Sequence, residues 1–236
     1  MAKTSSISPP IHHRVAIHGR VAIGFKLEGE EKWTLLPQLS RQVQVEIIAA
    51  PASFQRQLSL KSLSYGQNWD ALSDRPDRTH TAADGSFYFI DLPLGQYTLK
   101  ATCPRQSTRL QGAEAVVEIS DGQKPEWKEL ILATTGIVGQ VKTKLSNSDE
   151  FVPVRQTQIQ VVNGSEQTRC DRDGKFQLLN LEAPENPSIR KLRLQISAPG
   201  YDTYTQDVDL LRGAVHSFPN IQLTKKVPVK ANGTSA

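Results

Sequence analysis

The sequence lacks the features that mark most specialised classes of protein. It has only two cysteines and one methionine in 236 residues, and two cysteines are too few for a disulfide framework. No apolar stretch approaches the ~20 residues that a membrane-spanning helix needs. The first residues, MAKTSSISPPIHHRV, contain no apolar core of the kind that a secretory signal has. We therefore expect a cytoplasmic protein in which Cys103 and Cys170 are reduced thiols.

Concentrated positive charge is also missing. The net charge is +4 and the isoelectric point is about 9.1, but no run of five lysines or arginines occurs and the excess is spread along the chain. Proteins that bind nucleic acid usually gather their basic residues in one patch or arm. We therefore expect neither a nucleic-acid partner nor a membrane span.

Recognisable catalytic and metal-binding motifs are missing as well. The sequence has no HExxH zinc motif, no GxSxG nucleophile elbow and no glycine-rich phosphate loop of the usual kinds. His12 and His13 are adjacent and would face opposite sides of a strand, so they cannot easily share a metal ion. In the stretch from Asp171 to Gly174, the spacing of a calcium loop would place Arg169 at the first ligand position, so we interpret it as a turn. We expect no catalytic residue, no metal and no cofactor.

Turn formers and alternating apolar residues are abundant. Residues 84–99 read DGSFYFIDLPLGQYTL. The pair Asp84-Gly85 is typical of a hairpin turn, because glycine accepts a positive φ at little cost. Phe87 and Phe89 then alternate with outward-facing positions, as in a strand with one buried face. After a second turn that ends at Gly95, Tyr97 and its neighbours resume the alternation, which predicts turn, strand, turn, strand.

A weaker copy of this pattern begins at Asp173-Gly174 and continues with Phe176. The flanking segments repeat in the same order and predict roughly seven short strands per copy, among them Val43–Ile47, Ala115–Ile119, Trp127–Leu132, Gln158–Val162, Leu192–Ile196, Tyr204–Leu210 and Phe218–Leu223. We find no convincing long helix. The sequence therefore predicts an all-β protein of two tandem Greek-key β-sandwiches, residues 11–134 and 135–224, between flexible tails at 1–10 and 225–236.

The motif resembles the carboxypeptidase regulatory-like domain, which has a transthyretin-like (prealbumin-like) β-sandwich. The first copy has the G-x-V of Gly19 to Val21, followed by DGSFYF and LPLGQYTL. The second has the G-x-V of Gly139 to Val141 and DGKF, but a longer connection at 181–187 replaces the Leu-Pro-x-Gly turn. The resemblance covers about nine tenths of the chain and implies a fold more than a function, because this family serves mainly as an accessory module.

An insertion at residues 51–78 is present only in the first copy. It is rich in large apolar side chains, including Phe54, Leu58, Leu63, Tyr65 and Trp69. One interpretation is that it packs over its own sandwich as a long hairpin or lid. The other is that it docks a partner, because exposed aromatic residues anchor protein interfaces and inserted loops on rigid scaffolds often have functions.

These observations favour a non-catalytic structural or adaptor protein that binds other proteins. By analogy, such modules occur in large bacterial assemblies, including phage-tail-like contractile particles. A first alternative is a carbohydrate- or peptide-binding accessory module in which Trp33, Trp69 and Trp127 are stacking candidates. A second is a regulatory subunit of a separately encoded enzyme.

Overall fold

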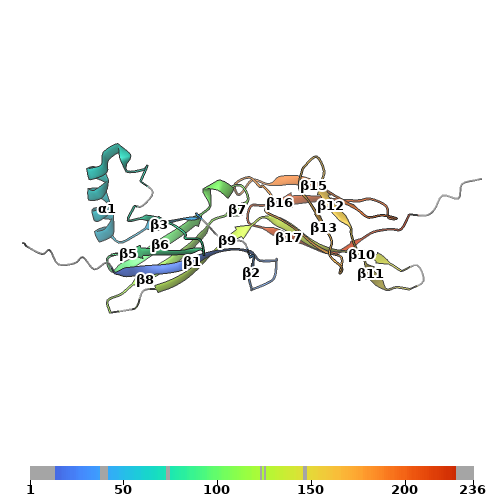
Figure 1. Ribbon diagram of the computed structural model, residues 1–236, viewed down its shortest axis with the longest axis horizontal. Coiled ribbons are helices and arrows are strands. Elements are labelled where there is room, and N and C mark those ends of the chain that lie inside the picture. The colour runs from blue at the N-terminus through green and yellow to red at the C-terminus, as the bar shows by residue number, and fades with distance from the viewer. Residues whose placement is uncertain are drawn as a thin grey trace, which may run out of the picture. The chain divides into compact units, whose positions relative to one another are not determined.

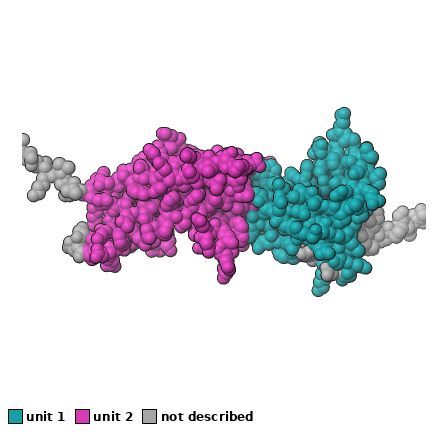
Figure 2. All heavy atoms as spheres, turned by 180° about the vertical axis from the view of Figure 1, so that it is seen from behind, with its two compact units in different colours: residues 1–22, 38–104, 112–131 teal, residues 23–37, 105–111, 132–236 magenta. Residues whose placement is uncertain are grey.

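The computed structural model describes residues 14–37, 42–72, 75–122, 124, 126–145 and 148–226, and most of its regular structure is β-strand (Figure 1). The described residues form two compact units. The first consists of the described parts of 1–22, 38–104 and 112–131, and the second of the described parts of 23–37, 105–111 and 132–236 (Figure 2). The domain limits expected from the sequence, 11–134 and 135–224, stay a prediction. Residues 1–10, His12 and His13 lie outside the described residues, as does the C-terminal tail after Lys226.

The first unit is a sandwich of two β-sheets. In one sheet, β1 (Val15–Phe25) lies between β5 (Ser86–Ile90) and β9 (Glu126–Thr134). The other sheet has the order β4-β3-β6-β8, with bounds Arg78–His80, Gln44–Ala49, Gly95–Thr102 and Ala113–Ile119. The alternate side chains that face inward are fully buried, as the strand period requires, and they include Ile17, Val45, Phe87, Tyr97 and Leu99.

The second unit is also a sandwich of two sheets. In one, β10 (Gly136–Lys144) pairs with β11 (Phe151–Pro153), β14 (Lys175–Leu179) and, in parallel, β17 (Val215–Gln222). The other has the order β13-β12-β15-β16, with bounds Gln167–Arg169, Gln158–Val161, Arg190–Ser197 and Tyr204–Leu210. Residues of this unit also form two short strands: β2 (Thr34–Leu35) pairs with Gly24–Phe25, and β7 (Leu110–Gln111) pairs with Ala133–Thr134. A single helical turn, η2 (Pro104–Gln106), precedes β7.

The prediction of two all-β sandwiches is confirmed, and the strand count differs slightly. Among the described residues the second sandwich has eight strands, β10 to β17, instead of seven. The additional strands are short edge segments such as β11 and β13, which have three residues each. Segments of that length have no alternation long enough to recognise in a sequence.

The two Asp-Gly turns have the backbone that the sequence predicts but join different strands. Gly85 has φ +84° and Gly174 has φ +71°. The hairpin interpretation was wrong, because each turn takes the chain from one sheet to the other: β4 and β13 precede the turns, whereas β5 and β14 pair with β1 and β10. The turn is fixed by the first strand, since the Gly85 carbonyl accepts a 2.9 Å hydrogen bond from the Val21 N–H.

The G-x-V glycine explains how this first strand fits beneath the motif. A side chain at Gly19 would overlap the Lys128 carbonyl and the ring of Phe87. In the second unit, a side chain at Gly139 would overlap the Phe218 carbonyl and the ring of Phe176, each 2.7 Å from the position of a Cβ. The glycine and the phenylalanine of DGxF are therefore one packing device that occurs twice.

Tyr97 fixes the Leu-Pro-x-Gly turn of the first unit. Its ring is fully buried, and its hydroxyl donates a 2.8 Å hydrogen bond to the Pro93 carbonyl, four residues upstream. Burial raises the pKa of Tyr97 to about 12, so the hydroxyl keeps its proton at neutral pH. By strand register, the corresponding residue of the second unit is Leu192, which has no hydroxyl to make such a bond.

Candidate functional site

The insertion of the first unit folds into a helix, so the expected absence of a long helix was wrong, and of the two forms considered for packing over the sandwich, the long hairpin is excluded. Helix α1 (Ala52–Tyr65) follows Pro51, and a single helical turn, η1 (Gly66–Asn68), follows it after Gly66 takes a positive φ (Figure 1). Phe54, Leu58 and Tyr65 have helical spacing, which was the available signal. Four serines and the presence of only one buried side chain weaken that signal, because serine is a mediocre helix former.

The start of α1 is fixed to the sandwich by packing. Gly95 has φ +133°, and a side chain there would overlap the ring of Pro51. Three residues later, the ring of Phe54 packs edge-on against Tyr97, with 5.8 Å between the ring centroids, and is 3% exposed. Gly95 and Tyr97 of the LPLGQYTL motif therefore hold the start of the insertion, and Tyr97 is also part of the buried core.

The return of the insertion is held by a cluster of charges around Arg75. The guanidinium lies 4.9 Å from the centre of the Trp69 ring and donates hydrogen bonds to both carboxylate oxygens of Asp77. Arg75 and Asp77 are both nearly buried, and the hydrogen bond to Asp77 raises the pKa of Arg75. Next to them Arg78 bonds Glu46 across β4 and β3 at 2.9 Å. The pairing leaves both arginines neutralised.

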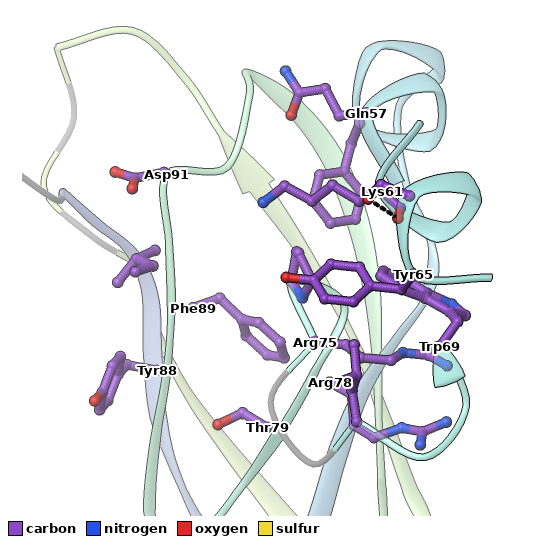
Figure 3. Close-up of a pocket in the computed structure, with 15 residues that line it drawn as sticks. Gln57, Lys61, Tyr65, Trp69, Arg75, Arg78, Thr79, Tyr88, Phe89 and Asp91 are labelled. Atoms are coloured by element: carbon purple, nitrogen blue, oxygen red, sulfur yellow. Dashed lines mark hydrogen bonds between the residues drawn. The ribbon is translucent and has the colours of Figure 1, made fainter. Parts of the chain in front are cut away.

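Between these two attachments the helix does not close onto the sandwich. A cavity of about 600 Å³ lies between α1, the return segment and the edge strands β4 and β5 of the first unit. Figure 3 shows Lys61 and Tyr65 of the helix pointing toward Phe89 of β5 across this space. The volume is in the range of pockets that take small ligands or short peptide segments.

Lys61 provides the uncompensated charge of this cavity. Among the described residues it has no ion-pair partner, unlike Arg75 and Arg78, which also line the cavity. Its side chain extends into the open space (Figure 3). Aromatic surface comes from Tyr65 and Trp69, whose ring centroids are 6.1 Å apart. Within the described part of the chain, the cavity thus offers apolar walls and Lys61 as a cation without an ion-pair partner, with Asp91 at its border. It suits an occupant with apolar groups and an acid that reaches Lys61.

The five residues proposed from the sequence as a docking loop divide into three groups. Tyr65 and Trp69 line the cavity. Phe54 lines it and also fixes the helix to the core. Leu58 is half-buried outside the cavity, and Leu63 is 79% exposed on the outer side of the helix. The sequence reasoning missed the lining residues that are not apolar, which no hydrophobic pattern can reveal: Gln57, Lys61, Ser64, Arg75, Arg78, Thr79 and Asp91.

Other candidate residues are not brought together by the fold. Both cysteines are free thiols, and burial raises the pKa of Cys170 to about 11, so it is a poor nucleophile at neutral pH. No group of three or more His, Cys, Asp and Glu that could hold a metal ion occurs in the described part of the chain. Among those residues, no helix is both long and apolar enough to cross a membrane.

Similarity to known proteins is confined to solved structures. No family model and no curated protein matches the chain. It is similar to a minor pilin from Streptococcus agalactiae (13% identity, 91% of this chain and 100% of that chain covered, TM-score 0.30). It is also similar to a shaft pilin from Lactobacillus rhamnosus GG (12% identity, 91% of this chain and 100% of that chain covered, TM-score 0.35). A third similar structure is a candidate cell adhesion protein from Bacteroides ovatus (12% identity, 90% of this chain and 96% of that chain covered, TM-score 0.43). Scores at this level define neither a family nor a function for this chain.

Proposed function

We propose that this chain is a non-catalytic binding protein that docks a partner protein in the cavity beneath α1. The observation that supports the proposal is the way the insertion is built. It is fixed at both ends to a rigid sandwich and still leaves about 600 Å³ open beneath its helix. A segment that served only to complete the core would fill that space, because protein interiors are close-packed.

The proposal also covers the family of the protein, its location and the assembly in which it acts. The motif DGSFYFIDLPLGQYTL supports membership of the carboxypeptidase regulatory-like family, whose modules serve as accessories to other proteins. A place in the cytoplasm, within a large bacterial assembly such as a phage-tail-like contractile particle, is part of the same proposal by analogy. A regulatory subunit of a separately encoded enzyme would use the same docking cavity and remains an alternative.

Two tryptophan substitutions on α1 test the docking. Ser64 lines the cavity and Ser59 does not, although both are exposed and both hydroxyls donate to a backbone carbonyl of the helix. Ser64→Trp would place a bulky ring in the cavity and obstruct it, whereas Ser59→Trp would add the same side chain elsewhere on the helix. Immobilised wild type and the Ser59 variant should retain the same partner from native lysate, identified by mass spectrometry, and the Ser64 variant should lose it. An identical set of proteins on all three would contradict the proposal.

Carbohydrate binding is a second candidate, favoured by a row of rings on the outer face of the first unit. Tyr88 pairs across the strands with His18, whose ring packs edge-on against Trp127 at 5.3 Å. Tyr88 and Trp127 are both more than half exposed. On a glycan array, Trp127→Ala should then abolish binding and Trp33→Ala should not. Equal signals from both variants would dismiss this candidate.

A further inference from the structure

The free edge of β5 presents unpaired backbone groups toward the cavity. The Gly85 carbonyl accepts a hydrogen bond from Val21 of β1, and the Asp91 N–H donates to the carbonyl of Arg14, which directly precedes β1. The Ser86 carbonyl points the other way and accepts from the Ala82 N–H. Because backbone groups alternate in direction along a strand, the N–H and C=O of Tyr88 and Ile90 also point away from β1. Among the described residues, β5 has no strand partner other than β1, and no hydrogen bond joins those four groups to a neighbour.

The cavity lies along this edge. Four consecutive residues, Tyr88 to Asp91, line it. Side chains of a strand alternate between two faces, so a cavity on one face would be lined by every second residue. Figure 3 shows Phe89 pointing toward the helix and Tyr88 pointing to the opposite side. The backbone edge itself therefore borders the space. The three lining residues that belong to β5, Tyr88 to Ile90, form about 10 Å of strand edge along the cavity.

On the basis of the proposed function, we propose that the occupant is an extended peptide segment with an acidic side chain, which adds to the free edge of β5 as a further strand. Main-chain hydrogen bonds to Tyr88 and Ile90 would hold the segment. Its alternate side chains would meet the aromatic walls beneath α1, and its acid would reach Lys61. This is strand addition to a sheet edge, in which backbone bonds give affinity and alternate pockets give specificity.

The second unit shows why the edge of β5 differs from an ordinary one. Strand β14 is the counterpart of β5 and likewise pairs only with the first strand of its unit among the described residues. Its outward positions are Lys175 and Gln177 in place of Ser86 and Tyr88, and charged side chains discourage pairing at an edge. A tight turn at residues 162–166 stands where the first unit has α1. Among the described residues, the equivalent edge therefore has no helix beside it.

The test uses a library of linear octapeptides displayed on phage and selected on the full-length protein, with the Ser64→Trp variant as the counter-selection. We expect enriched sequences with alternating apolar residues and one acid. A synthetic copy of the best peptide is then N-methylated at one residue at a time. Methylation at alternate residues should weaken binding at least about 10-fold, and methylation at the residues between them should change it little, because only one set of amides faces β5.

Matched protein variants complete the test. Ile90→Pro removes a donor from the cavity edge, and Leu179→Pro removes the corresponding donor from β14; edge strands accept proline where the N–H is not used. The first should lose the peptide and the second should keep it. Lys61→Glu should weaken the acidic peptide at least about 10-fold, and Lys61→Arg should retain it. A selection that yields no binder sensitive to Ser64→Trp, or N-methylation effects without alternation, would overturn the inference. Loss of the partner protein in Ser64→Trp would still support the proposed function in that case.

Discussion

The two copies share a frame and differ most at the connection that follows β3 in the first copy and β12 in the second. In both, a glycine of the first strand makes room for the phenylalanine of DGxF, and a positive-φ glycine crosses between the sheets. The copies differ after β3 and its counterpart β12. In the first copy, β3 is followed by α1, which borders the cavity, whereas in the second a five-residue turn, 162–166, joins β12 to β13. The frame is thus a scaffold that occurs twice, and the candidate site belongs to the copy that has the insertion.

The largest expected effect concerns the shared frame. Phe87 and Phe176 are 2% and 3% exposed at equivalent positions. Each substitution to alanine should cost its own unit about 3–5 kcal/mol in the free energy of unfolding, because a large ring leaves a cavity in a close-packed core. Residue-resolved hydrogen exchange would assign each loss to a unit. A loss in only one copy would break the equivalence of the two frames.

The buried charge cluster is specific to the first copy. Arg75→Ala should cost about 3 kcal/mol, because it leaves the buried carboxylate of Asp77 without its partner. In the second unit, Arg193→Ala removes an exposed pair with Asp207 and should change stability little, since water screens exposed pairs. Denaturant unfolding of the two variants measures both effects, and equal effects would show that the Arg75 cluster does not hold the insertion in place.

A single methyl group added at Gly95, where the start of α1 packs on the sandwich, should destabilise the first unit. Gly95→Ala places a side chain where φ is +133° and where the ring of Pro51 packs, so we expect a loss of about 2 kcal/mol in the stability of the first unit. Circular dichroism should show less helix, because α1 starts at that contact. Unchanged helicity would mean that Phe54 alone fixes the helix.

The smallest expected effect concerns the hydroxyl of Tyr97. Tyr97→Phe should cost about 1 kcal/mol at neutral pH, because it removes the bond to Pro93 and keeps the ring. The folded pKa of about 12 is raised above the ordinary tyrosine value of 10.0, so the neutral hydroxyl stabilises the fold fully below pH 10 and this contribution is lost as the pH rises toward 12. Alkaline unfolding of the first unit should therefore be less steep in the variant. Parallel curves would contradict the assignment.

The frame could be predicted because its signals are local and repeated. Phe87, Phe89 and Tyr97 alternate with polar residues, and the same order returns at Phe176, so one pattern supports the other. The sequence does not show to which sheet each strand belongs, because β5 and β14 pair with the first strand of their unit, which is distant in the sequence. The Asp-Gly turns were therefore mistaken for hairpins.

The candidate site was only half visible in the sequence. Tyr65 and Trp69 were recognised as large apolar residues with no obvious place in a core. Lys61, Arg75 and the backbone edge of β5 could not be found in this way, because they come together through long-range packing. The helix itself was obscured by its serines and by the fact that only Phe54 is fully buried along its length.

The most direct measurement is amide hydrogen exchange of the full chain with and without the partner that the Ser64→Trp variant fails to retain. The account predicts added protection at the amides of Tyr88 and Ile90 and along α1, and no change at Gln177 and Leu179 of the second copy. Protection at both edges, or at neither, would contradict the claim that the insertion makes the first copy the docking site.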